Sequence, residues 1–253
     1  MNNFNVVDNN LQVYHVLEDS TFNVAPRLNA QLLFANYQGS KLDITVNDNS
    51  TLKLVYFTNC YDDNHFKIQV LENTTLYVDV ILLNGNTDFN LEVDVDGSNA
   101  FVDVKTLSLA KNNEKYINIK INHNAIESKS SVTNYGSSFE NGINRFTTIG
   151  KIHKNMKNSD VRQITRGLLL SPTGVCLAEP ILLIDYYDVK AYHGATIGKI
   201  SDDDLFYLMS RGLSKEEAFM LIINGLVEPF LKDILDEELR GAVMDIYEEY
   251  FRG

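Results

Sequence analysis

The stretch YINIKI at residues 116–121 alternates apolar and polar side chains more regularly than any other part of the chain. A period of two places the apolar side chains on one face, which is typical of a β-strand with one buried side. The pattern recurs at 52–57 (LKLVYF), 66–70 (FKIQV), 75–80 (TLYVDV), 91–95 (LEVDV) and 100–104 (AFVDV). Clusters of Asn, Asp, Gly and Ser separate these stretches, and Asp96-Gly97 indicates a tight turn. We therefore expect strands and turns from about residue 52 to about residue 184.

No amphipathic helical segment of convincing length separates these strands. This observation argues strongly against a doubly wound α/β fold, in which helices must lie between parallel strands. A sandwich, a barrel and a stacked β-solenoid remain. The periodicity alone does not choose among the three.

The pattern changes near Ile200. Ser201 and the three aspartates after it predict the capped start of a helix that Gly212 ends. Ser214 and Glu217 match a capping box, which predicts a second helix as far as about Pro229.

A third helix is predicted from about residue 236 to about residue 250. One face of it would carry the apolar residues Leu239, Val243, Ile246 and Tyr247. A long β region is thus expected to precede a compact helical tail.

The bulk composition narrows the function. The net charge of −12, without clustered Lys and Arg, argues against a nucleic-acid partner. The first ten residues lack the basic and apolar regions of a signal peptide, and the apolar stretches are too short to span a bilayer. The two cysteines, Cys60 and Cys176, form no CxxC pair, so a reducing cytoplasm is the expected location.

The residues alone reveal no catalytic constellation. No two of the five histidines are spaced as a metal-binding pair, and the HExxH, P-loop and GxSxG motifs are absent. His193 has small neighbours that would let a partner or an ion approach, although an imidazole bonded to backbone at a strand end is the simpler explanation from these residues alone. Cys176 lies in an apolar stretch and is expected to be a buried hydrophobic side chain. Asp185 and Asp188 could form a glycosidase-like pair or only a charged strand end.

Two ordered blocks add a resemblance. The first block consists of GKIH at 150–153, NSD at 158–160 and RGLLLSP at 166–172. The second consists of DVK at 188–190, HGAT at 193–196, Gly198, LFYL at 205–208, SRG at 210–212 and EEA at 216–218. In order and spacing these blocks resemble the C-terminal half of the SufB/SufD family of the SUF iron–sulfur cluster assembly system, over about residues 125–232.

The resemblance implies a mainly β fold: a right-handed parallel β-helix followed by a small C-terminal helical domain. It therefore selects the solenoid among the three β folds. The β-helix would occupy residues 1–199, with 1–50 less clearly patterned, and the helical domain would occupy residues 200–253.

The resemblance also implies a function. The chain would be a non-catalytic scaffold subunit, closer to SufD because DVK precedes HGAT, and would pair with a SufB-type subunit or with itself. It would dock a SufC-type ABC ATPase and bind no nucleotide. An iron–sulfur cluster or iron would be held transiently and shared with the partner. Two alternatives stay open: a degenerate paralogue with a structural role only, and a β-solenoid that binds or processes polysaccharide.

The resemblance assigns roles to individual residues. His193 matches a histidine at the subunit interface that helps to hold iron or the cluster, and Asp188 and Lys190 would lie at the same interface. Cys176 is a second candidate ligand, although its position matches no SufD cysteine. Ala191 stands where SufD-type sequences often have Cys. The residues expected to contact the ATPase are Phe206, Tyr207, Arg211, Gly212, Leu221 and Leu226, and the alternative for each is a place in the core between helices.

Overall fold

The computed structural model describes residues 2–14, 18–37, 39–58 and 60–233, together with 237, 240, 241, 244 and 245. Within this part, only the backbone is described for Asp62, Glu216, Leu226, Val227 and Asp233. The apolar residues of the predicted third helix lie outside the described residues, namely Leu239, Val243, Ile246 and Tyr247.

The described chain forms sixteen β-strands followed by two helices. The strands are β1 Asn2–Val6, β2 Leu11–Tyr14, β3 Ser20–Val24, β4 Asn29–Ala35, β5 Lys41–Val46, β6 Thr51–Thr58, β7 Asp62–Val70, β8 Thr75–Leu82, β9 Thr87–Val95, β10 Phe101–Lys111, β11 Glu114–His123, β12 Lys129–Phe139, β13 Ile143–Ile152, β14 Asp160–Leu169, β15 Val175–Ile184 and β16 Lys190–Lys199. The helices are α1 Asp202–Ser210 and α2 Lys215–Asp233. Within the residues described, no helix is both long enough and apolar enough to cross a membrane.

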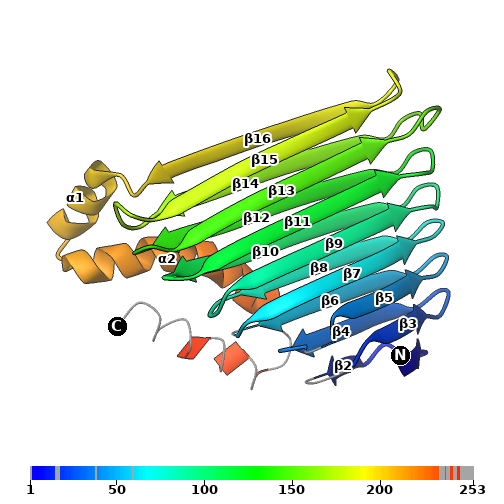
Figure 1. Ribbon diagram of the computed structural model, residues 1–253, viewed down its shortest axis with the longest axis horizontal. Coiled ribbons are helices and arrows are strands. Elements are labelled where there is room, and N and C mark those ends of the chain that lie inside the picture. The colour runs from blue at the N-terminus through cyan, green and yellow to red at the C-terminus, as the bar shows by residue number, and fades with distance from the viewer. Residues whose placement is uncertain are drawn as a thin grey trace.

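Successive strands alternate between two parallel sheets of eight strands each. The odd-numbered strands form one sheet, called the odd sheet, and the even-numbered strands form the other, the even sheet (Figure 1). Each strand therefore pairs with the strand two places along the chain, so the chain winds into stacked coils. This topology confirms the parallel β-solenoid. It also includes β1 to β5, the N-terminal part in which the sequence pattern is less clear.

The turn at Asp96-Gly97 shows how closely the coils approach. It connects β9 to β10, which belong to different sheets, so it forms no hairpin. A Cβ atom at Gly97 would lie 2.0 Å from the carbonyl carbon of Leu71 in the preceding coil. Glycine is required there because the two backbones nearly touch.

The period of two places apolar side chains inside the coils. Ile117, Ile119 and Ile121 are buried in the interior, whereas Asn118 and Lys120 lie on the outer face of the odd sheet. In the N-terminal coils aromatic rings fill this interior, and the centroids of Phe66 and Phe89 lie 5.3 Å apart in an edge-to-face arrangement.

Toward the C-terminal coils the interior becomes polar. Asn134 is buried, accepts a hydrogen bond from Thr106 Oγ1 at 2.8 Å, and donates to Thr148 and Thr165 at 2.9 and 3.2 Å. These bonds join β10, β12, β13 and β14, so one side chain links both sheets across the interior.

The helix α2 packs on the outer face of the even sheet (Figure 1). Its residues Ile223 and Phe230 are buried in an apolar cluster with Leu33, Ala35, Val55, Phe57, Ile81, Leu83, Leu107 and Leu109. The helix continues past Pro229, where the sequence predicted its end. Burial of Phe230, whose ring centroid lies 5.7 Å from that of Tyr135, stabilises the last turn and offsets the backbone hydrogen bond that proline cannot donate.

The predicted helix caps are confirmed. Ser201 Oγ accepts a hydrogen bond from Asp204 N at 3.3 Å, and Gly212 has a φ of 98° after the end of α1. In the capping box, Ser214 N donates to Glu217 Oε2 at 2.7 Å and Glu217 N donates to Ser214 Oγ at 3.1 Å.

Asparagines form a ladder along one row of turns. Asn49, Asn73 and Asn99 have φ values of 58°, 53° and 57°, in the left-handed region that asparagine tolerates better than most residues. The side chain of Asn99 donates to that of Asn73 at 3.4 Å, and the side chain of Asn73 donates to that of Asn49 at 3.3 Å. The same residue type therefore serves the turn conformation and the stacking of coils.

His123 is fully buried in the polar part of the interior. Its Nδ1 atom lies 2.7 Å from Ser128 Oγ and its Nε2 atom lies 2.8 Å from Ser130 Oγ. Burial disfavours the charged imidazolium and lowers the pKa of His123 from 6.5 to about 4.

The asparagine ladder predicts that Asn73→Ala lowers the free energy of unfolding by about 1–2 kcal/mol, because alanine is strained at a positive φ. Asn73→Gly loses the same side-chain bonds but accepts the backbone conformation, so it is expected to lose less. Urea denaturation of both variants measures the difference. Equal losses would show that the positive φ is not the cause.

The lowered pKa of His123 predicts that the free energy of unfolding depends on pH. Its pKa is lower in the folded state, so the unfolded state binds more protons below about pH 6.5. The contribution, about 3 kcal/mol, is complete above that pH and is lost as the pH falls toward 4.

Denaturation at several pH values tests this contribution. His123→Gln is expected to unfold with a shallower dependence on pH between 7 and 4 than the wild type. An unchanged slope in His123→Gln would contradict the assignment.

Candidate functional site

The solenoid ends in two long edge strands. β15 pairs with β13 and β16 pairs with β14, and in the described part of the chain nothing pairs with their outer edges. Each strand has ten residues, and β16 lies at the upper limit of the molecule in Figure 1. Such edges present unpaired N–H and C=O groups that can hydrogen-bond to another chain.

The inner face of this last coil is open. On β14 the inward residues Val161, Gln163, Thr165 and Gly167 are buried. Their register partners on β16 are Ala191, His193, Ala195 and Ile197, which are exposed although they occupy the same face. Inward positions are exposed here because no further coil among the described residues covers them.

His193 lies in the middle of this open face, in register with Gln163. Its side chain is exposed, and no hydrogen bond or ion pair to it is found among the described residues. The imidazole therefore has both ring nitrogens available to an incoming group. The alternative of an imidazole held by neighbouring backbone is not observed in the described structure.

Cys176 lies inside the coil at the start of β15 and is 6% exposed. A Cβ atom at Gly167 would lie 2.5 Å from its Sγ atom and 3.0 Å from Ile197 Cγ1, which places Cys176 across the interior from Ile197. Burial raises the pKa of the Cys176 thiol to about 11, so without a bound metal the thiol is protonated at neutral pH. The prediction of a buried hydrophobic side chain is confirmed.

The two candidate ligands are not brought together. His193 is four residues from Ile197 on an extended strand, a separation of roughly 13 Å between Cα atoms. Among the described residues, no group of three or more His, Cys, Asp and Glu side chains could hold a metal ion. Of the two predicted ligands, only His193 is exposed at the open end.

Asp188 and Lys190 lie at the turn that leads into β16. Asp188 O accepts a hydrogen bond from Asn158 N at 2.8 Å, and Lys190 N donates to Ser159 O at 2.9 Å. Both side chains are exposed and line an open groove of about 900 Å³ that runs along the turns as far as Asn99. Asp185, the other member of the glycosidase-like pair, is held through its backbone N–H, which donates to Ile152 O at 3.0 Å.

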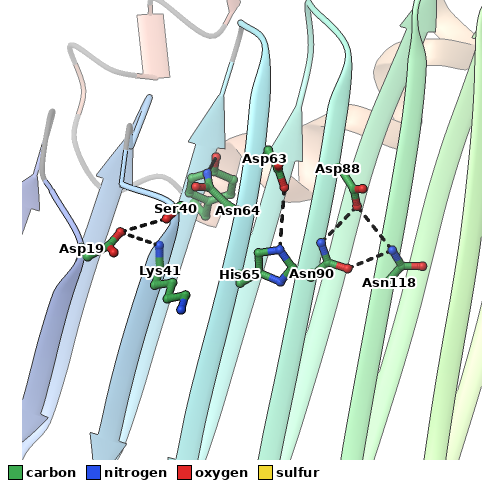
Figure 2. A network of polar contacts seen from close by, with 10 residues as sticks. Asp19, Ser40, Lys41, Asp63, Asn64, His65, Asp88, Asn90 and Asn118 are labelled. Atoms are coloured by element: carbon green, nitrogen blue, oxygen red, sulfur yellow. Dashed lines mark hydrogen bonds and ion pairs between the residues drawn. The ribbon is translucent and has the colours of Figure 1, made fainter.

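The outer face of the odd sheet carries polar groups that bond to one another (Figure 2). His65 Nε2 lies 3.7 Å from Asp63 Oδ1. The side chain of Asn118 donates to that of Asn90 at 3.0 Å, and the side chain of Asn90 donates to Asp88 at 3.0 Å. The contacts of His65 with Asp63 and of Asn90 with Asp88 lie within single strands, whereas the bond between Asn118 and Asn90 joins neighbouring coils.

The helix α1 presents a second exposed surface. Phe206 is 75% exposed, Tyr207 and Leu221 are more than half exposed, and Arg211 and Gly212 are exposed as well. The Arg211 guanidinium lies 5.2 Å from the centroid of the Tyr207 ring. The alternative of a core position is therefore wrong for Phe206 and Tyr207 in the described structure. The side chain of Leu226 lies outside the described residues.

Sequence reasoning missed one residue beside His193. Gln163 is buried on the inner face, in the same phase as Val161 and Thr165. The available signal was a polar side chain at an inward position of the alternating stretch VRQIT at 161–165.

Comparisons with known proteins agree with this arrangement. Residues 6–226 match the family described as SUF system FeS cluster assembly, SufBD core domain. The iron-sulfur cluster assembly protein SufD of Bacillus subtilis is 30% identical over 169 residues, which cover 66% of this chain and 39% of that protein. SufD of Escherichia coli is 25% identical over 215 residues, which cover 83% of this chain and 51% of that protein.

A shorter match concerns a SufBD family protein of Pyrococcus horikoshii, which is 45% identical over 87 residues, 34% of this chain and 20% of that protein. The chain thus spans about half the length, or less, of the curated relatives that it matches. The family match covers most of the chain, and two relatives that align over most of it are SufD proteins. This chain therefore belongs to the SufBD core family of the SUF iron–sulfur cluster assembly system and lies close to SufD.

Proposed function

We propose that this chain is a SufD-like scaffold subunit on which an iron–sulfur cluster, or the iron for it, is assembled as cargo. It acts as an assembly protein in the cytoplasm and not as an enzyme. The observation that carries the proposal is the open end of the solenoid, where His193 on the edge strand β16 is exposed and has no bonding partner among the described residues. The family match does not support the alternative role in polysaccharide binding.

The open end is proposed as the surface that pairs with a SufB-type subunit or with a second copy of this chain. Its strands are long enough to continue a sheet into a partner, and apolar side chains such as Leu182 and Ile197 would be covered by that contact. The charged side chains of Asp188 and Lys190 lie at the rim, where they would orient the partner.

His193 is proposed as this chain's ligand for the cargo. A neutral imidazole nitrogen binds iron, and the covered end of a pair would exclude water from that bond. Cys176 is buried and lies away from His193, so it is not proposed as a ligand. The remaining ligands would come from the partner subunit.

The exposed face of α1 is proposed as the docking surface for a SufC-type ABC ATPase. Phe206 and Tyr207 are large aromatic side chains that a partner could bury, and Arg211 lies next to them. The helix α2 follows α1 and packs on the even sheet through the cluster that contains Ile223 and Phe230. A movement of the docked ATPase would therefore be transmitted from α1 through α2 to the coils.

The role of His193 is tested by anaerobic reconstitution of the chain with its partner subunit. His193→Ala is expected to lower the affinity for iron by about tenfold or more, because one ligand is lost. His65→Ala is the matched control, since His65 is exposed on the outer face of the odd sheet. Iron and sulfide are measured per pair, and pairing is followed separately by sedimentation. Unchanged iron binding in His193→Ala would overturn the ligand role.

The docking surface is tested by co-purification with the ATPase. The double variant Phe206→Ala, Tyr207→Ala is expected to weaken binding by about tenfold or more, as for aromatic anchors at other interfaces. The circular dichroism spectrum should stay unchanged because α1 has no buried residue in the described structure. Tyr61→Ala is the control, because Tyr61 is 73% exposed at a turn of the solenoid. Equal binding by the double variant and the control would contradict the proposal.

A further inference from the structure

The side chain of Gln163 fills a space in the interior beside Gly150. It is 2% exposed, faces inward from β14, and its Nε2 atom donates to Ile181 O at 3.3 Å. A Cβ atom at Gly150 would lie 2.9 Å from this Nε2 atom and 2.6 Å from Val161 Cγ1. The missing side chain at Gly150 thus leaves the space in which the Gln163 amide lies.

The amide oxygen of Gln163 is buried and has no hydrogen-bond partner in the described structure. Its direction is fixed, because the nitrogen must face the Ile181 carbonyl and two oxygens would repel there. An unpaired buried acceptor destabilises the folded state, because it has given up its hydrogen bonds to water. The other residues with buried unpaired atoms, Gln31, Asn113 and Arg145, are half-buried outside the interior, so Gln163 differs from them in its position.

The nearest side chain along the same ladder is His193. Gln163 and His193 are register partners on β14 and β16, and they occupy the same face of adjacent parallel strands about 4.8 Å apart. A neutral imidazole has one N–H donor and one acceptor nitrogen. The exposed ring of His193 is free to turn its N–H toward an oxygen one rung below.

We propose that Gln163 is a positioning residue for His193: its Oε1 atom accepts a hydrogen bond from one ring N–H and thereby fixes the imidazole tautomer. The second ring nitrogen then points out of the open end with its lone pair available. This arrangement matches the way in which a metal-binding histidine is oriented through its other nitrogen. The inference deepens the proposed function, since it rests on His193 as the ligand for the cargo.

The test is nitrogen-15 NMR of histidine-labelled full-length chain at about pH 8, where an ordinary imidazole is neutral. The wild type is expected to show one tautomer of His193 and a ring N–H proton that exchanges slowly with water. Gln163→Met keeps the side-chain length but removes the acceptor, so both tautomers and a fast-exchanging N–H are expected. A wild-type mixture of tautomers, or an unchanged tautomer in Gln163→Met, would overturn the inference.

The matched control is Thr165→Val on the same strand. Thr165 is equally buried and polar, but its register partner is Ala195, so its replacement should leave the tautomer of His193 as in the wild type. A mixture of tautomers in this control would mean that any disturbance of the interior has the same effect, and the inference would fail.

Iron binding separates the inference from the proposed function. If both hold, Gln163→Met lowers the affinity for iron of the paired chain by about tenfold or more. His193→Ala could leave iron binding unchanged while Gln163→Met still gives a mixture of both His193 tautomers. In that case the ligand role of His193 fails, but the hydrogen bond between Gln163 and His193 stands.

Discussion

The backbone hydrogen bonds between stacked coils govern this molecule. Each strand inside the solenoid is paired in parallel on both edges. Because neighbouring strands lie about 4.8 Å apart, the turns that connect them must also stack at about this distance. Glycine is needed where turns approach most closely: a Cβ atom at Gly142 would lie 1.9 Å from Ala110 O. Asparagine is favoured where the chain must enter the left-handed region at the same point of successive coils.

The same constraint creates the functional end. A coil in the middle of the stack has no unpaired strand edge and no exposed inward face, so it can offer a partner only its outer surfaces. The strands β15 and β16 have an unpaired edge and an exposed inward face among the described residues. Gln163 and His193 both occupy inward positions, but Gln163 on β14 is buried and His193 on β16 is exposed. The placement of the proposed ligand His193 on an inward position is understandable if the proposed partner replaces the missing coil. Among the described residues, α2 does not cover this opening, because it is attached to the outer face of the even sheet.

The strands, the turns and the caps of α1 and α2 were predictable because each depends on residues close together in the sequence. The choice of a solenoid needed the family resemblance, since alternation within a strand does not specify its neighbours. Features that depend on contact between coils were not predicted: the ladder that includes Asn73, the continuation of α2 past Pro229, and the unpaired oxygen of Gln163. The exposure of Phe206 and the separation of Cys176 from His193 likewise required the fold.

The polar interior near the open end has a consequence for His193. A shift of β16 by one residue would turn His193 outward and Tyr192 inward, since successive side chains of a strand face opposite sides. The interior below resists such a shift in its own strands, because Asn134 meets Thr106, Thr148 and Thr165 together in one register only. Aliphatic side chains would tolerate a shift in strand register better than Asn134 does, since their contacts are not directional. A misplaced buried amide loses its hydrogen bonds. The polar coils therefore fix the register of β14, and β14 in turn fixes the side of the sheet on which His193 lies.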